Sequence, residues 1–547
     1  MDGQVEMKAC ISALRRFPAL PRPRTSGQCY CFAQSYLTSN GRMPSIVPED
    51  GKYSMPVGMV FVFNLMIGTG ALALPKAFGE AGVLMGPIML LLACAVSYIG
   101  VTFVIESMAI STVVLKQKEE ADMENKSSSS SLSEETPLLF DEDGLRRLEL
   151  SEMGELLMGK VGFIAVQAFM CIYLLGDLAI YSTVVPKSIM EIVCQHQGNS
   201  CNLAEMPLDD PCSPFALQAW IITRFDFYRI CVALFICLVG PFVFFGMTKT
   251  KLLQMFTTWT RWMAFLIMLG LSAGILARGQ GTGRPKLADP KGFSHLFGVA
   301  TYAFMCHHSL PGLVTPIRHR QWLYRNMGLV YLLVTGFYAA LALTGIFAFA
   351  SLQDVYTLNF FDPCRTETPS GFAEWLRAVA DYFLALFPVF ALASNFPIVA
   401  ITLKNNLLAV VKLIKAHTQS RSTVSLDDSS EVMLLQRPRT ISLDASIKYW
   451  EEFAVTLAIL VIPCAISLAT DNVESLASIT GGYAGVGVQF VVPALLVLAA
   501  RRRSVAGWVL EDVPHLASPF RGRGWPIALL FWAALTLILV TLNTILS

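Results

Sequence analysis

Long apolar runs dominate this sequence and limit what it can fold into. A transmembrane helix needs about 20 apolar residues, and about eleven segments of that kind follow one another along the chain. They lie at roughly 56–78, 83–110, 161–190, 228–248, 252–277, 294–316, 327–351, 376–402, 449–470, 478–500 and 525–546. Because backbone in lipid must satisfy its own hydrogen bonds, and alternating barrel strands are absent, the sequence predicts an all-α integral membrane protein.

Composition excludes several function classes. Of the 547 residues, 54% are hydrophobic and 15% are charged, whereas a soluble domain has about 25% charged residues. The 41 basic and 40 acidic residues give a net charge of +1, which does not indicate nucleic acid as a partner. The 13 cysteines contain no CxxC pair, and no HExxH, GxSxG or P-loop motif is present, so we expect no enzyme, no bound metal and no cofactor.

The charges of the loops predict a cytosolic N-terminus. Basic residues cluster in the N-terminal segment and after the even-numbered spans, which is typical of cytosolic loops. They are Arg15, Arg16, Arg22, Arg24, Lys52, Lys249, Lys251, Arg318, Arg320, Arg325, Lys404, Lys412, Lys415, Arg501, Arg502 and Arg503. The basic loop 278–293 departs from this rule. No cleavable signal peptide is evident, and eleven spans put the C-terminus outside the cell or in a lumen.

The polar parts of the chain divide it into segments. Residues 1–55 are predicted to form a cytosolic segment without a packed core, ahead of a multi-span domain at 56–546. Two cytosolic insertions, 116–155 and 416–447, have the composition of disordered segments. The outer loop at 191–227 holds three cysteines, so a disulfide is expected there with its pairing open: Cys194, Cys201 and Cys212.

The first insertion carries a sorting pattern. Glu134 precedes Leu138 and Leu139 by the spacing of an acidic dileucine signal. Such a signal would recruit sorting adaptors and direct the protein to endosomes or lysosomes, with the plasma membrane as the alternative. The pattern also arises by chance.

Two spans contain helix-breaking residues. In the first, Gly68-Thr69-Gly70 is followed by Pro75, and both residue types weaken a helix. In the sixth, His307 and His308 precede Pro311-Gly312. Interruptions at matched places in two halves of a membrane protein are typical of a transporter binding site, where unwound backbone lines a cavity. The alternative for the glycines is close helix contact through small residues.

Several segments have a recognisable pattern: Asn64 to Ala77, Phe304-Met305-Cys306-His307, Asn395-Phe396-Pro397, and Thr480 to Gly485 with Phe490 to Pro493. They resemble the amino acid/auxin permease superfamily. Phe103 to Glu106 and Gly176 to Tyr181 resemble most closely its transmembrane protein 104 group. The resemblance implies a LeuT-like inverted repeat of five plus five helices with one helix added.

The resemblance also implies roles for residues of the two interrupted spans. Gly68, Thr69 and Gly70 fall on the backbone that holds a substrate carboxylate, and Phe304 and Cys306 border the second break. Asn64 falls where sodium-coupled members place a cation ligand. The eighth span departs from the family because Pro388 and Pro397 are spaced differently, so Ser394 is only a guess for a second cation ligand.

Charged residues inside spans are further candidates. Asp177 lies near the middle of span 3, where a carboxylate costs several kcal/mol unless it is paired, hydrated or protonated. It is either a proton carrier or a structural group. His307 can relay protons, and its neighbour His308 points about 100° away on a helix. Glu106 is expected to be paired or near the interface, and Arg261 either pairs with one of the acids or reaches the interface.

These observations predict a secondary active transporter of amino acids or similar small organic solutes, coupled to protons or sodium. Its expected partners are membrane lipid and the solute. The alternative is a membrane sensor or scaffold that binds a solute without transporting it and signals through its cytosolic loops.

Overall fold

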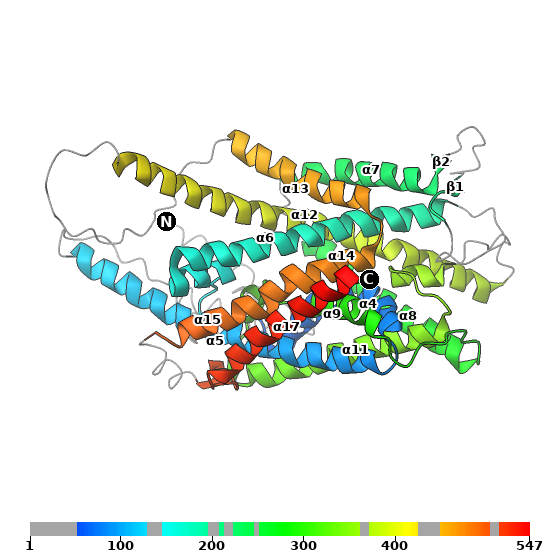
Figure 1. Ribbon diagram of the computed structural model, residues 1–547, viewed down its shortest axis with the longest axis horizontal. Coiled ribbons are helices and arrows are strands. Elements are labelled where there is room, and N and C mark those ends of the chain that lie inside the picture. Colours follow the sequence, from blue (N-terminus) through cyan, green and yellow to red (C-terminus); the bar gives the residue numbers. More distant parts are fainter. Residues whose placement is uncertain are drawn as a thin grey trace, which may run out of the picture.

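The protein is a helical bundle in its computed structural model, which describes residues 52–127, 145–194, 207–212, 222–245, 251–361, 371–424, 449–503 and 514–546. Figure 1 shows the helices running side by side along the long axis, with α6 (Leu150–Val193) through the middle of the view. Strands β1 (Pro211–Cys212) and β2 (Ile222–Thr223) form a short antiparallel pair at one end. Large apolar side chains cover much of the exterior, as a surface in contact with lipid requires.

The element order fits the predicted series of eleven spans. Among the described residues, nine helices are long and apolar enough to cross a membrane, and a bent pair makes a tenth span. The pair α9 and α10 lies where the sixth of the eleven predicted spans falls. The helices are α3 (Met55–Met66), α4 (Thr69–Ala81), α5 (Met85–Ser127), α6, α7 (Arg224–Phe245), α8 (Lys251–Ala277), α9 (Phe293–Ala303), α10 (Leu310–Val314), α11 (Leu323–Ala348), α12 (Phe372–Val424), α13 (Tyr449–Ala469), α14 (Val473–Ile479), α15 (Val492–Ala500) and α17 (Gly524–Leu546).

Both predicted interruptions are present. Helices α3 and α4 meet at an angle of 55° across Ile67 and Gly68. Helix α9 ends at Ala303, and α10 begins at Leu310 after six residues outside α-helix. Because four spans, α5 to α8, lie between the two breaks, the broken spans cross the bundle in opposite directions. This is the five-plus-five inverted arrangement expected for the chain, with α17 as the added helix.

The tenth span is wound differently from the others. Between α14 and α15 it forms two π-helical stretches, η6 (Thr480–Gly485) and η7 (Gly487–Val491). Glycines bring its backbone against α9: a Cβ atom on Gly481 would lie 2.0 Å from the carbonyl oxygen of Gly298. The Gly-rich segment of span ten therefore supports the broken span directly.

The predicted cytosolic insertions are shorter than expected. Helix α5 continues to Ser127 and α12 to Val424, and both project beyond the bundle in Figure 1. In α5 the extension is rich in Lys and Glu, which favour helix, and Glu119 pairs with Arg146 at 2.8 Å. The prediction of disorder was wrong for residues 116–127, 150–155 and 416–424, which are helical. The sorting pattern at Glu134 lies outside the described residues.

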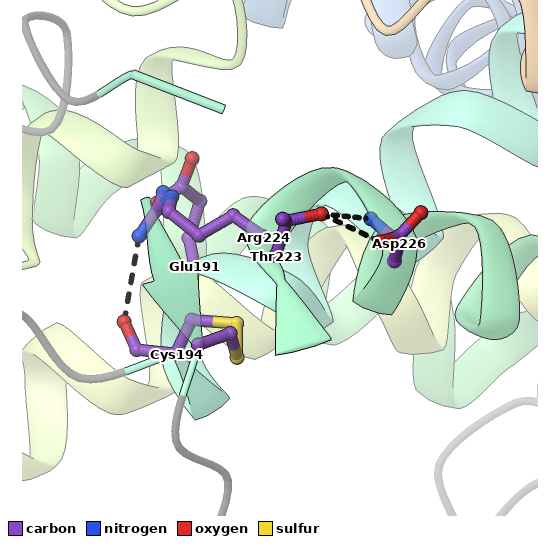
Figure 2. The surroundings of a disulfide bond; sticks show 6 residues. Glu191, Cys194, Thr223, Arg224 and Asp226 are labelled. Atoms are coloured by element: carbon purple, nitrogen blue, oxygen red, sulfur yellow. Dashed lines mark hydrogen bonds and ion pairs between the residues drawn. A yellow bond between two sulfur atoms is a disulfide. The ribbon is translucent and has the colours of Figure 1, made fainter. Parts of the chain in front are cut away.

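A disulfide closes the loop between α6 and α7. Figure 2 shows Cys194 with its disulfide beside Arg224, which forms an ion pair with Glu191 and donates to the Cys194 carbonyl at 3.4 Å. The cysteine partner is Cys212, which settles the pairing that the sequence left open. Cys201 lies outside the described residues. We call the end of the bundle that holds this bond the disulfide end.

A buried ion cluster joins three parts of the chain at the disulfide end. Lys187 of α6 donates to Asp354 at 2.9 Å and to Asp471 at 3.2 Å. Asp354 lies in the loop after α11 and also accepts from the backbone of Val473 at 3.0 Å. Burial raises the pKa of the Asp354 carboxyl, but the Lys187 ammonium outweighs this effect and holds the pKa below its ordinary value.

Replacement of Lys187 by Met should destabilise the protein by about 3 kcal/mol at neutral pH, because it leaves the buried Asp354 charge without its partner. Without Lys187 the burial effect dominates, so the pKa of Asp354 rises and the carboxyl becomes neutral in mild acid. The loss relative to the parent should therefore shrink as pH falls.

The measurement is SDS denaturation of the purified protein at several pH values. Lys160→Met, at an exposed position of the same helix, is the matched control and should be neutral. Equal stability of Lys187→Met and the parent at neutral pH would contradict the role of the cluster.

Candidate functional site

The break in the first span places two glycines in different surroundings. A Cβ atom on Gly68 would have no heavy atom within 4 Å, so this backbone borders open space. A Cβ atom on Gly70 would lie 2.6 Å from Cα of Ala303 in α9. Gly68 therefore has room for a side chain, as the predicted substrate backbone requires, whereas Gly70 fits the alternative of close helix contact.

A chain of three side chains leads from this break to span 3. Thr69 Oγ1 lies 2.7 Å from Tyr302 Oη, and Tyr302 donates a short hydrogen bond to Asp177 Oδ1. Since the single Tyr302 proton goes to Asp177, the Thr69 hydroxyl must donate to Tyr302. The three residues come from α4, α9 and α6, and all are buried. The structure thus connects the predicted substrate backbone with the predicted proton carrier.

One phenol connects the two breaks. Tyr338 of α11 places Oη 2.7 Å from the carbonyl oxygen of Met66 and 3.0 Å from that of Ala303. These are the carbonyls at the ends of α3 and α9, which have lost their helical partners. A phenol has one proton, so Tyr338 can donate to only one of them at a time.

A second polar chain satisfies the break in the sixth span. Cys306 Sγ lies 3.2 Å from Tyr331 Oη, which lies 3.0 Å from Ser97 Oγ. Ser97 in turn donates to the carbonyl of Phe304 at 3.5 Å. The Phe304 ring stacks on Tyr331 with centroids 5.9 Å apart. Cys306 and Phe304 are therefore buried in the wall of the break, and their contacts here are with α5 and α11.

The two histidines have different neighbours, although they lie outside α-helix, to which the predicted separation of about 100° applies. His307 donates from Nε2 to the Ser97 carbonyl at 3.2 Å, toward α5. His308 packs on Tyr173 of α6, with ring centroids 5.5 Å apart. Nδ1 of His307 is buried without a hydrogen bond among the described residues. In this arrangement His307 is separate from the chain that ends at Asp177.

Asn64 accepts hydrogen bonds from two side chains of span 5. Its side-chain oxygen accepts from Trp262 Nε1 at 2.8 Å, and its carbonyl oxygen accepts from Arg261 Nη1 at 2.7 Å. Ser394 donates to Ala391 in its own helix at 2.9 Å, and no hydrogen bond joins it to Asn64 in the described part of the chain. The structure does not bring the two predicted cation ligands into contact.

The remaining charged candidates have structural partners. Arg501 forms a bidentate pair with Glu106, with contacts of 2.6 and 2.9 Å, and the backbone of Ser518 donates to the same carboxylate. The expected pairing of Glu106 is thus present. Arg261 binds backbone and forms no ion pair with Glu106 or Asp177 among the described contacts, so the suggestion that it neutralises one of them was wrong.

Sequence reasoning missed three residues of this site. They are Tyr302, Tyr338 and Trp262. Each is an aromatic residue in a hydrophobic span, where aromatic residues are common. One signal was available: a buried Tyr or Trp needs a hydrogen-bond partner for its polar atom. The two predicted breaks offer backbone carbonyls that have lost their helical partners, so a Tyr or Trp in a neighbouring span was a candidate donor.

Comparisons with known proteins give a matching family and similar proteins. The family described as "Transmembrane amino acid transporter protein" matches residues 51–512. A solved crystal structure of MhsT in complex with L-phenylalanine is 13% identical and covers 90% of this chain and 99% of that chain, with a TM-score of 0.49.

Relatives with similar sequences span almost the whole chain. The Transmembrane protein 104 homolog of Caenorhabditis elegans is 39% identical over 502 residues, which are 90% of this chain and 97% of that protein. Transmembrane protein 104 of Homo sapiens is 36% identical over 534 residues, which are 92% and 99% of the two chains. The chain belongs to the transmembrane amino acid transporter protein family, and within it to the group formed by Transmembrane protein 104 and its homologs.

Proposed function

We propose that this protein is a secondary transporter of amino acids or similar small organic solutes, coupled to protons through Asp177. The observation that carries the proposal is the directed chain from Thr69 through Tyr302 to Asp177. Family membership supports amino acids as the solute class. The open space beside Gly68 supports a solute site next to Thr69.

The chain gives protonation a direct effect on the solute site. When Asp177 is ionised, Tyr302 donates to it and Thr69 donates to Tyr302, so the Thr69 oxygen offers only lone pairs to a ligand. When Asp177 is protonated, both bonds can reverse, so that Asp177 donates to Tyr302 and Tyr302 donates to Thr69. The Thr69 hydroxyl keeps its proton and can point it toward the open space. Thr69 then becomes a donor to a solute carboxylate. Proton binding and carboxylate binding therefore favour each other.

The contacts of Asn64 favour protons over sodium as the coupling ion. Sodium needs several oxygen ligands, but the Asn64 amide oxygen already accepts from Trp262 and its carbonyl from Arg261. Arg261 also brings a fixed positive charge to the end of α3, where it complements the helix dipole. This charge would repel a sodium ion at the same carbonyl.

The disulfide supports the orientation inferred from loop charges. Disulfides persist in oxidising compartments, so the disulfide end faces the cell exterior or a lumen and the N-terminus is cytosolic. Either the plasma membrane or an endosomal or lysosomal membrane satisfies this condition.

Asp177→Asn should abolish accumulation driven by a pH gradient, because Asn is similar in size and cannot titrate. The purified protein is reconstituted in proteoliposomes and offered a mixed amino-acid pool, with a pH gradient or a sodium gradient alone. We expect uptake with the pH gradient in the parent and in the control Asp209→Asn, which lies at an exposed position near the disulfide end.

Uptake driven by sodium alone would contradict proton coupling. Solute binding without uptake under either gradient would instead favour the sensor. An Asp177→Asn variant that accumulates solute as well as the parent does would remove Asp177 from the mechanism.

Tyr302→Phe should uncouple solute binding from pH while it leaves Asp177 in place. In the parent, solute affinity should rise as pH falls, by up to about tenfold per pH unit for one linked proton. Without the phenol, the proton on Asp177 no longer reorients Thr69, and the affinity should become nearly independent of pH. The measurement is solute binding at several pH values, with Tyr324→Phe, which lies away from the breaks, as the control. A pH dependence that survives in Tyr302→Phe would contradict the chain.

The two glycines of the first break should respond differently to substitution. Gly68→Val adds a side chain to the open space and should weaken solute binding by about 1–3 kcal/mol with little effect on stability. Gly70→Val must displace the backbone of α9 and should mainly lower stability. Thermal unfolding and solute binding distinguish the two outcomes, and Gly270→Val, at an exposed site with open space around it, is the control. Normal affinity in a stable Gly68→Val protein would contradict the solute site.

A further inference from the structure

Three ligand-type side chains meet at the disulfide end, apart from the chain that ends at Asp177. Glu80 lies in the last turn of α4, His295 in the first turn of α9, and Glu474 in the first turn of α14. His295 Nδ1 is 3.2 Å from Glu80 Oε2 and 3.4 Å from Glu474 Oε1. One ligand atom from each residue lies within 4.8 Å of the other two.

We propose that Glu80, His295 and Glu474 bind a divalent transition-metal ion, with Zn²⁺ as the best-fitting case. One imidazole and two carboxylates form a ligand set that suits zinc. Tetrahedral zinc with bonds of about 2.0–2.1 Å holds its ligand atoms roughly 3.3–3.4 Å apart. The two separations measured from His295 Nδ1, 3.2 and 3.4 Å, are close to these values, and all three ligand atoms lie within 4.8 Å of one another.

The buried oxygen of Glu474 is the second observation that points to a ligand. Glu474 is 2% exposed, and its Oε1 atom accepts no hydrogen bond among the described residues. Lys76 lies 3.3 Å from the other oxygen, Oε2, and leaves Oε1 directed at His295. A buried carboxylate oxygen without a donor is costly, and a metal ion would satisfy it.

Solvent can reach the other two ligands. The side chains of Glu80 and His295 are 39% and 40% exposed, and a cavity of about 260 Å³ lies beside them. Lys286, which also lines this cavity, is neutralised by Asp289 at 2.7 Å. Lys76, which lies 3.3 Å from Glu474, brings a positive charge to the ligands, so we expect binding of intermediate strength rather than a permanently held ion.

The competing arrangement is a protonated His295 that bridges the two carboxylates. It would use the same distances and exclude a metal, because a zinc-bound imidazole nitrogen cannot carry a proton. The two arrangements differ in whether the purified protein takes up a metal ion, and this can be measured without any transport assay.

The test uses the purified full-length chain, stripped with EDTA and titrated with Zn²⁺ in a calorimeter. We expect one ion to bind in the parent and affinity to fall by at least about tenfold in His295→Gln and in Glu80→Gln. Lys286→Ala with Asp289→Ala, which removes a pair beside the cavity but no ligand, should bind as the parent does. If zinc bound to cysteine thiols elsewhere in the protein instead, His295→Gln and Glu80→Gln would not change its affinity.

Co²⁺ gives an independent readout, because its visible absorption depends on coordination geometry. A tetrahedral Co²⁺ spectrum in the parent that is absent from His295→Gln would support the site. Both ligand substitutions are at partly exposed positions, so thermal unfolding of the metal-free variants should match that of the parent. Failure of the parent to bind either ion, or equal binding by the parent and both ligand variants, would overturn the proposal.

Discussion

Unwound backbone inside an apolar bundle must find hydrogen-bond partners, and the centre of this structure depends on that constraint. The first break exposes the carbonyls of Asn64 and Met66, and the second exposes those of Ala303 and Phe304. Side chains from other spans reach them: Arg261 donates to Asn64, Ser97 donates to Phe304, and Tyr338 can donate to either Met66 or Ala303. Spans 2, 5 and 7 are therefore fixed against spans 1 and 6 by donors rather than by apolar contact alone. Tyr338 lies within reach of both breaks and has one proton. Its hydrogen bond can therefore switch between the carbonyl of Met66 in the first break and that of Ala303 in the second.

Small residues make the same centre compact. Gly70 allows α4 to touch α9, and Gly298 and Gly481 allow α9 to touch the π-helical part of span ten. A chain of hydrogen bonds through Thr69, Tyr302 and Asp177 needs this closeness, because each bond spans two different helices. Glycine thus has two uses in the first span: Gly70 brings helices together, and Gly68 keeps the space beside the break open.

The fold was largely predictable from the sequence, and the site only in part. Apolar runs gave the spans, and Gly68, Gly70 and Pro311 gave the breaks, because these are local properties of composition. Asp177 stood out as a candidate because a carboxylate in a span is costly. The donors to the broken backbone could not be recognised from the sequence. Tyr338 binds the carbonyl of Met66, which is 272 residues away in the chain, and Trp262 binds Asn64, which is 198 residues away. No local pattern distinguishes such an aromatic residue from one that only packs, and none distinguishes the role of Gly68 from that of Gly70.

The partners of the buried charges indicate which of them can carry a proton. Glu106 is paired with Arg501, Glu191 with Arg224, and Asp354 with Lys187. Protonation of Glu191 or Asp354 would leave a buried cation without its partner, at a cost of several kcal/mol. Asp177 instead accepts from the neutral phenol of Tyr302 and forms no ion pair among the described contacts. If Asp177 gained a proton, its hydrogen bond could reverse and no charge would be left unpaired. Among Glu191, Asp354 and Asp177, a change of charge is therefore least costly at Asp177, which is also the one connected to the break beside the open space.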